Sequence, residues 1–177
     1  MKKILFLVAL CLGAVAAQAQ NHAVGVRFGG SVEFLYQHEL SADNFLRFSV
    51  AVPNFDGVAV TGTYNWHCFE WTDWTPKTCD WYLDAGVGGA LGMYHFKKDT
   101  IYTYDQDNDI IDVTTKRRPG FMAGVVGSVA FGCRFKAAPI SLEVDYRPVI
   151  GVVAGGSEKG FFGPGLWNFG VGVKFHF

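Results

Sequence analysis

Hydrophobic and polar residues alternate along most of the chain, and the alternation is clearest in the last thirteen residues, 165–177. Every second position there is bulky and apolar, and the positions between are small or polar. Because successive side chains of a β-strand point to opposite faces, this period of two predicts a strand with one apolar and one polar face. The apolar face is formed by Trp167, Phe169, Val171, Val173, Phe175 and Phe177.

Seven earlier segments show the same period of two, and turn-forming residues separate most of them. Together with the final segment they predict eight antiparallel strands. The longest predicted loops are 97–119 and 154–164, although residues 100–104 and 110–114 could instead continue the flanking strands as an exposed edge for a partner's strand. The eight segments are approximately 22–29, 31–40, 45–52, 58–68, 79–96, 121–135, 140–152 and 165–177.

The first nineteen residues have the pattern of a secretory signal and are excluded from the fold. Lys2 and Lys3 precede an apolar run that ends at an A-x-A cleavage motif, residues 17–19. We therefore expect residues 1–19 to be removed and residues 20–177 to form one exported domain. Without the two lysines, 13 basic and 16 acidic residues remain, a formal charge of −3 that gives no electrostatic basis for binding nucleic acid.

An exported chain that is 50% hydrophobic but has no spanning helix has two natural solutions. No segment beyond the signal reaches the ~18 consecutive apolar residues of a membrane helix. The first solution is a transmembrane barrel whose apolar face meets lipid, because most segments approach or exceed the ~9–11 residues that a tilted strand needs to cross. The second is a soluble, lipocalin-like carrier with the apolar face inside. Alternation alone does not distinguish the two orientations.

The polar faces of the predicted strands carry eleven ionisable residues, five basic and six acidic. In a membrane barrel they point into the lumen, which in an eight-stranded barrel is only wide enough to be filled by side chains. A closed interior requires nearly balanced charge, because an unpaired buried charge is strongly destabilising. The sequence thus predicts a plugged lumen with an ion-pair network formed by Arg27, Glu33, Glu39, Arg47, Asp80, Asp84, Arg134, Glu143, Asp145, Arg147 and Lys174.

Few residues suggest reactive or metal-binding chemistry. Cys68 and Cys79 flank a predicted turn with the same strand parity, which predicts a disulfide in an oxidising compartment, with two free thiols as the alternative. Residues 105–109 (DQDND) begin like a calcium loop but lack the Gly required at its sixth position, so a hairpin tip is the better interpretation. We expect no metal and no cofactor.

The histidines also give no case for catalysis, since their spacing does not match a metal site. His67 and His176 are predicted to be hydrogen-bonded groups of the lumen. His95 has outward parity near the outer rim, where a barrel lipase would place catalytic residues, but no Ser of outward parity lies beside it. We therefore expect no enzyme activity.

The signal, the alternating strands and the terminal Phe resemble the small eight-stranded outer-membrane barrels of the OmpX and OmpA-transmembrane type. The resemblance implies an all-β, up-and-down transmembrane barrel over the whole exported chain, without catalytic residues. It also implies that Phe169, Phe175 and Phe177 form the signal read by the barrel-assembly machinery. Four segments are more closely similar to the uncharacterised outer-membrane β-barrel domain family of Bacteroides-like bacteria: VEFLYQ (32–37), TGTYNW (61–66), WYLDAGVG (81–88) and LEVDYRP (142–148).

These observations predict a monomeric outer-membrane protein with a closed, side-chain-filled polar lumen. Its role is expected to be structural or adhesive, exerted through loops 97–119 and 154–164. The expected partners are outer-membrane lipid and lipopolysaccharide, the barrel-assembly machinery, and an extracellular protein or other surface ligand at those loops. A lipid-modifying barrel enzyme is the first alternative, which would need Ser, His and an acid together at the outer leaflet. The soluble carrier is the second.

Overall fold

The computed structural model describes residues 21–177 except 54–56, 72–76, 105–109, 156–157 and 163. For residues 53, 94–104, 110–119, 155, 158–162 and 164–165 it describes the backbone alone. The predicted signal and the predicted calcium-like segment lie outside the described residues. No helix in the described ranges is long and apolar enough to cross a membrane. The elements are β1 (His22–Gly29), β2 (Ser31–Glu39), β3 (Asn44–Pro53), β4 (Gly57–Trp71), β5 (Cys79–Tyr104), β6 (Ile110–Phe135), β7 (Ile140–Tyr146), β8 (Val149–Gly155), β9 (Glu158–Phe162), the 3₁₀ helix η1 (Pro164–Trp167) and β10 (Phe169–His176).

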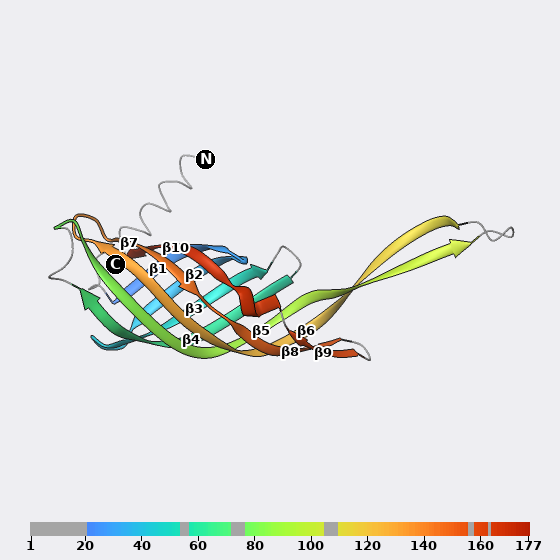
Figure 1. Ribbon diagram of the computed structural model, residues 1–177, viewed down its shortest axis with the longest axis horizontal. Helices are drawn as coiled ribbons and strands as arrows, with labels where there is room; N and C mark the ends of the chain where they lie inside the picture. The colour runs from blue at the N-terminus through green and yellow to red at the C-terminus, as the bar shows by residue number, and fades with distance from the viewer. Residues whose placement is uncertain (1–20, 54–56, 72–76, 105–109, 156–157, 163) are drawn as a thin grey trace, which may run out of the picture.

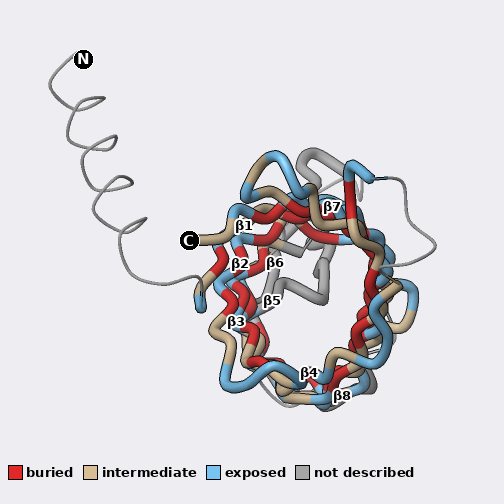
Figure 2. Tube along the Cα trace, turned by 90° about the vertical axis from the view of Figure 1, so that its left-hand side faces the viewer, coloured by how far each residue is buried: buried red, intermediate tan, exposed pale blue. Residues whose placement is uncertain are grey.

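All strand pairs are antiparallel, and the sheet closes on itself (Figure 1). Neighbours pair in sequence from β1 to β6. β7 and β8 both pair with β6, so they are two parts of one barrel strand. β9 pairs with β8, and β10 pairs with β7 and β1, so β9 and β10 form the last strand and close the ring. The predicted eight-stranded antiparallel barrel is thus confirmed, and Figure 2 shows the ring from one end.

A proline interrupts the seventh barrel strand. The sequence predicts one strand over 140–152, whereas β7 ends at Tyr146 and β8 begins at Val149. Pro148 lacks the amide hydrogen that a strand ladder uses. Its carbonyl oxygen still accepts a hydrogen bond from the N–H of Gly127 at 3.0 Å. The barrel wall therefore continues across the break.

The two ends of the barrel differ. The start of β1 and the end of β10 lie side by side at one end, called the terminal end below, where the backbone of His22 and Phe177 exchanges hydrogen bonds of 3.1 and 2.9 Å. The connections 40–43 and 136–139, also at the terminal end, are short. The opposite end carries the hairpins between β1 and β2, β3 and β4, β5 and β6, and β8 and β9.

The prediction that residues 97–119 form a loop is wrong, because most of this segment is strand. β5 continues to Tyr104 and β6 begins at Ile110, as the alternative assignment of those residues allowed. Pairing of β5 with β4 stops at Tyr94, and pairing of β6 with β8 stops at Phe121. Beyond these points the two described strands pair with each other and project from the barrel as a ribbon (Figure 1). Residues 95–104 and 110–120 are called the β5–β6 ribbon below, and its end of the barrel the ribbon end.

The prediction that residues 154–164 form a loop is also wrong. It contains the end of β8 and the whole of β9, which pair from Gly151 with Phe162 to Gly155 with Glu158. This hairpin ends before η1, and η1 leads the chain into β10. The chain therefore keeps its backbone hydrogen bonds in sheet ladders at the ribbon end, where the sequence predicted irregular connections.

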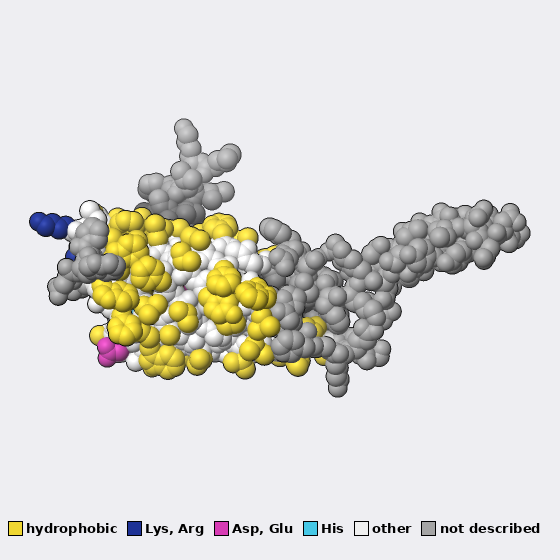
Figure 3. All heavy atoms as spheres, in the orientation of Figure 1, with side chains coloured by type: hydrophobic (Ala, Val, Ile, Leu, Met, Phe, Trp, Pro, Cys, Tyr) yellow, Lys and Arg dark blue, Asp and Glu magenta, His cyan; other side chains and the backbone are white. Residues whose placement is uncertain are grey.

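The outer surface of the barrel is apolar. Side chains of outward parity are well exposed, as shown by Phe34 (66%), Val125 (64%) and Leu91 (58%). Figure 3 shows hydrophobic side chains spread over the side of the barrel. Residues of inward parity are buried instead, and they include Arg27 and Asn65, both 0% exposed. The apolar face of the sheet thus lies on the outside of the barrel, and many of its charged residues lie inside.

The interior has a polar part and an apolar part. The predicted polar lumen therefore describes only one part of it. Small and medium apolar side chains of inward parity pack together toward the ribbon end. Buried polar side chains occupy the remainder of the interior. This apolar cluster contains Ala51, Ala59, Ala90, Met122, Val126, Val149 and Val153.

Candidate functional site

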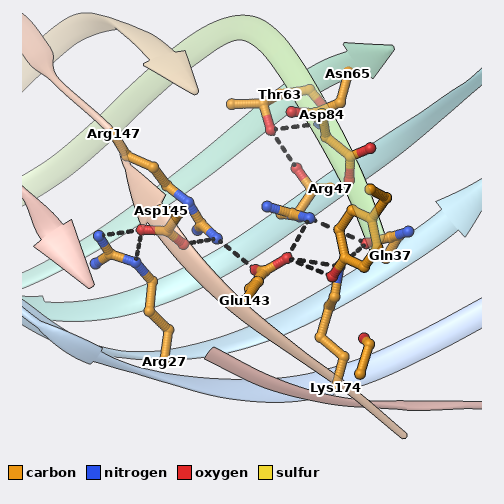
Figure 4. Close-up of polar contacts among 12 residues, drawn as sticks. Arg27, Gln37, Arg47, Thr63, Asn65, Asp84, Glu143, Asp145, Arg147 and Lys174 are labelled. Atoms are coloured by element: carbon orange, nitrogen blue, oxygen red, sulfur yellow. Dashed lines mark hydrogen bonds and ion pairs between the residues drawn. The ribbon is translucent and has the colours of Figure 1, made fainter. Parts of the chain in front are cut away.

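Glu143 on β7 is the centre of the charged interior (Figure 4). Its carboxylate lies 2.8 Å from Nζ of Lys174 on β10 and 3.2 Å from Nη2 of Arg47 on β3. Nη2 of Arg147 lies 3.4 Å away, and the hydroxyl of Tyr82 donates from 3.4 Å. Three cations therefore surround one carboxylate. Arg147 also pairs with Glu33 and Asp145, and both Arg47 and Lys174 donate to Oε1 of Gln37, so each cation has a further polar partner in this buried site.

Arg27, Glu33, Asp145 and Arg147 form a second set of ion pairs next to Glu143. Nη1 of Arg27 lies 2.9 Å from Glu33, and its Nη2 lies 2.6 Å from Asp145. Arg147 completes a ring, 3.1 Å from the other oxygen of Glu33 and 2.7 Å from the other oxygen of Asp145. Each of these four groups thus has two oppositely charged partners. All four side chains are at most 5% exposed.

Glycines on β10 leave the space that the side chains of these ion pairs occupy. β10 lies between β1 and β7 in the sheet, so the side chain of Arg27 must cross β10 to reach Asp145. A Cβ atom at Gly170 would lie 2.5 Å from Cζ of Arg27, and one at Gly172 would lie 3.0 Å from Cγ of Glu143. The small residues between the aromatic positions of the last strand therefore provide the room for the charged side chains.

His67 on β4 joins two acids at the terminal end. Its Nδ1 lies 2.7 Å from Asp84, and its Nε2 lies 3.2 Å from Glu39. An ionised carboxylate only accepts hydrogen bonds, so both ring nitrogens must carry hydrogen in this geometry. His67 is therefore an imidazolium that balances two acids. The other predicted lumen histidine, His176, is hydrogen-bonded to Oγ of Ser141 at 2.9 Å.

A cavity of about 650 Å³ opens at the terminal end above His67. Arg134 and Lys136 also line it. The β5–β6 register places Asp80 opposite Arg134, but Asp80 pairs with Lys136 at 2.8 Å instead. The guanidinium of Arg134 lies 5.9 Å from the ring centre of Tyr82. Both cations and acids, among them Glu39 and Glu70, line the mouth, and the described residues contain no cluster that could hold a metal ion.

The structure brings most of the eleven predicted lumen residues together. Seven belong to the two sets of ion pairs, and Glu39 and Asp84 bind His67. Asp80 and Arg134 lie at the mouth, where Arg134 lines the same cavity as Glu39 and His67. Sequence reasoning missed the uncharged members, although their inward parity would have identified several of them. Arg27 also donates to Asn168 Oδ1 at 3.0 Å, and Gln37 Oε1 accepts from Lys174 at 3.1 Å and from Arg47 at 3.2 Å.

The predicted disulfide between Cys68 and Cys79 is wrong, because both are free thiols in the structure, as is Cys133. The ladder between β4 and β5 shifts register between His67 and Phe69, so Cys68 lies in a bulge close to Leu83. Cys79 is four residues from Leu83 along β5, a distance of about 13 Å at the rise of a strand. A disulfide needs Cα atoms within about 7 Å, so the two thiols cannot meet.

The remaining candidate residues lie apart from the network. Phe169 and Phe175 are 54% and 38% exposed on the outer face, and Phe177 is half-buried. His22 and His38 contact each other on the terminal end, with their Nδ1 atoms 3.2 Å apart. The side chain of His95 lies outside the described residues.

Comparison with known proteins adds one similarity. No protein-family model matches the chain, and no curated protein sequence matches it. Among solved structures, the chain is similar to the N-terminal β-barrel domain of Pseudomonas aeruginosa OprF, with 15% sequence identity and a TM-score of 0.33, over 90% of this chain and 100% of that one. The more specific Bacteroides-type resemblance drawn from the sequence stays a prediction.

Proposed function

We propose that the protein is an integral outer-membrane barrel that does not conduct ions and has a structural or surface-binding role. The observation that carries this proposal is the apolar outer face around a charged interior. Soluble monomers rarely expose contiguous apolar patches larger than a few hundred Å². A bilayer removes that cost, and a closed barrel leaves no unpaired strand edge in lipid. The predicted soluble carrier would need the reverse arrangement, with the apolar face around an internal cavity.

Aromatic side chains at the terminal end support membrane placement. Trp71 and Trp81 lie in register on β4 and β5, and both rings contact Phe131 on β6, at centroid distances of 6.1 and 5.1 Å. Phe69 stacks on Trp71 at 5.8 Å. Aromatic rings favour the interface between hydrocarbon and water, where barrels carry aromatic girdles. We take this cluster to mark the inner, periplasmic interface, which assigns the ribbon end to the cell exterior.

Two features oppose ion flow through the lumen. Toward the terminal end the charged side chains pair across the barrel, as Arg47 does with Glu143. Toward the ribbon end the apolar cluster around Met122 and Val126 replaces water with side chains. An ion would have to leave its hydration shell in both regions. The barrel therefore anchors and presents surface elements, and it does not act as a porin.

The β5–β6 ribbon is the surface element best suited to a partner. Beyond Tyr94 and Phe121 neither described strand has a neighbour on its outer edge, so both edges present unpaired backbone groups. An extended segment of an extracellular protein can add to such an edge by backbone hydrogen bonds. We propose this mode of surface contact for the adhesive role, with a monomeric barrel as its base. Lipopolysaccharide surrounds the barrel, and the barrel-assembly machinery inserts it.

Membrane placement is tested by fractionation and electrophoresis. The full chain, expressed in a bacterium with an outer membrane, should sediment with that membrane and migrate faster on gels before boiling than after. In a planar bilayer the purified protein should give no steady conductance. A soluble periplasmic product, or stable single-channel steps, would overturn the proposal.

The surface role is tested by removing the ribbon. Tyr94 and Gly120 are register partners, so an Asn-Gly turn can join them in place of residues 95–119. The shortened barrel should keep its gel shift but lose adhesion of expressing cells to host-cell or matrix surfaces. Unchanged adhesion relative to cells with the full chain would refute the ribbon as the contact surface.

A further inference from the structure

The cavity at the terminal end leads into the charged interior of the barrel and ends there. Its volume is about 650 Å³, and small-molecule sites usually measure about 300–1,000 Å³. His67 in its lining is held between Glu39 and Asp84, and the ion pairs of Glu143 occupy the interior. The paired side chains oppose passage, so a molecule that enters from the terminal end is retained in the cavity.

Arg134 brings a positive charge to this cavity that no described acid neutralises. The other four basic residues predicted for the lumen all pair with carboxylates. Asp80 lies opposite Arg134 in the β5–β6 register, but its carboxylate binds Lys136 at 2.8 Å. Within the described residues, the guanidinium of Arg134 instead lies 5.9 Å from the ring centre of Tyr82. It is therefore available to a carboxylate in the cavity, which a guanidinium binds through two parallel hydrogen bonds.

Glu70 brings the opposite charge to the same cavity. It lies near the end of β4, is exposed, and has no ion pair with a described side chain. Glu39, the other acid of the lining, is already bound by His67 at 3.2 Å. The cavity thus presents one cation and one anion that the described part of the chain leaves without a charged partner. A ligand that carries both an ammonium group and a carboxylate would satisfy both.

The strand register sets the separation of these two charges. Glu70 lies opposite Tyr82, and Tyr82 lies opposite Gly132, two residues before Arg134 on β6. At the usual strand spacing and rise, the Cα atoms of Glu70 and Arg134 are about 12 Å apart. Both side chains line the cavity, so their charged ends are closer together than the Cα atoms. An extended peptide of two or three residues spans roughly 7–10 Å, which matches this separation.

We propose that the terminal-end cavity binds a short peptide with free ends, its carboxylate on Arg134 and its ammonium group on Glu70. The connections 40–43 and 136–139 add small apolar side chains to the lining, which suits a peptide of small residues: Ala42, Ala137 and Ala138. Backbone hydrogen bonds hold both connections, as between Ser41 N and Asn44 O at 3.1 Å, so little ordering opposes binding. This ligand site goes beyond the proposed function and does not depend on membrane placement.

Binding is measured by ligand-observed NMR titration of the full exported chain, folded in detergent micelles. The probes are trialanine with free ends, trialanine amide, which lacks the carboxylate, and N-acetyl-trialanine, which lacks the ammonium group. The test variants are Arg134→Gln and Glu70→Gln. The matched controls are Lys77→Gln and Asp43→Asn, which change exposed charges at the terminal end outside the cavity lining. Far-ultraviolet circular dichroism checks that each variant is folded.

The wild-type chain should bind trialanine at least about tenfold more tightly than either blocked peptide, because each loses a hydrogen bond between charged groups. Arg134→Gln should weaken the binding of trialanine about tenfold but leave that of the amide unchanged. Glu70→Gln should do the same for trialanine and the acetylated peptide. Both controls should bind like wild type. The inference is overturned if the folded wild-type chain binds no trialanine, if it binds all three peptides equally, or if Arg134→Gln weakens acid and amide alike.

Discussion

Replacing Glu143 by Gln tests whether the interior ion pairs stabilise the barrel. The Glu143 side chain is 0% exposed, and its carboxylate lies 2.8 Å from Lys174 and 3.2 Å from Arg47. Glutamine keeps the shape but removes the charge, which leaves neighbouring cations without their shared anion. Breaking a buried ion pair by removing one partner costs about 3–5 kcal/mol, and we expect a loss of unfolding free energy in this range.

A second ion pair provides a matched control, because its N–O distance is the same but its side chains are more exposed. Lys136 lies 2.8 Å from Asp80, as Lys174 does from Glu143, but its side chain is 45% exposed and that of Asp80 is 33% exposed. Solvent screens such a pair, so Asp80→Asn should cost less than about 1 kcal/mol. Adding Lys174→Met to Glu143→Gln removes one of the stranded cations and should recover part of the loss.

Equilibrium unfolding in urea measures these differences. The barrel is refolded into lipid vesicles, and its tryptophan fluorescence is followed against urea concentration. With a slope of about 2 kcal/mol per M, a loss of ~4 kcal/mol moves the midpoint by about 2 M. Equal shifts for Glu143→Gln and Asp80→Asn would refute the argument, because burial would then have no bearing on the strength of the pair.

Three further outcomes follow from the packing. Gly92→Ala should destabilise the barrel by about 1–3 kcal/mol in the same urea assay, because the new Cβ would lie 2.7 Å from Val58 O, whereas Gly89→Ala, with 3.7 Å to its nearest neighbour, should cost nothing measurable. Val87→Arg, on the 55% exposed outer face, should cost about 2–4 kcal/mol in vesicles, and a neutral effect would contradict lipid contact. Maleimide should label exposed Cys68 in the folded protein and buried Cys79 only after unfolding, and a disulfide-linked peptide in the mass spectrum would contradict the free thiols.

The strand faces could be read from the sequence because a half-buried strand has a strict period of two. The alternation places Arg27, Glu33 and Asp145 each on the polar face of its own strand, and the structure brings the three together. What the sequence leaves undetermined is which inward residues meet across the lumen. Arg47 on β3 reaches Glu143 on β7, and only the closure of the barrel makes them neighbours.

The errors in the sequence interpretation have local causes. The bulge at Cys68 shifts the register of β4, and no residue-level signal such as Gly marks it, so the parity rule misplaced that thiol. Pro148 was included in a continuous strand, although it lacks an amide hydrogen. Residues 97–119 are predicted to be a loop, with 100–104 and 110–114 as possible extensions of the flanking strands, and the structure shows that both strands extend in this way. The apolar cluster around Met122 was missed because only the charged inward positions were counted.

The crossing of Arg27 over Gly170 links the first and last strands of the chain. Arg27 and Asp145 are 118 positions apart, and they meet only after β10 has docked between β1 and β7. Before that docking Arg27 can pair with Glu33 on β2 but not with Asp145, and the edges of β1 and β7 are open, a state that a bilayer strongly disfavours. For a barrel placed in the outer membrane as proposed, docking of β10 would thus complete the Arg27–Asp145 pair and remove the open sheet edges in the same step.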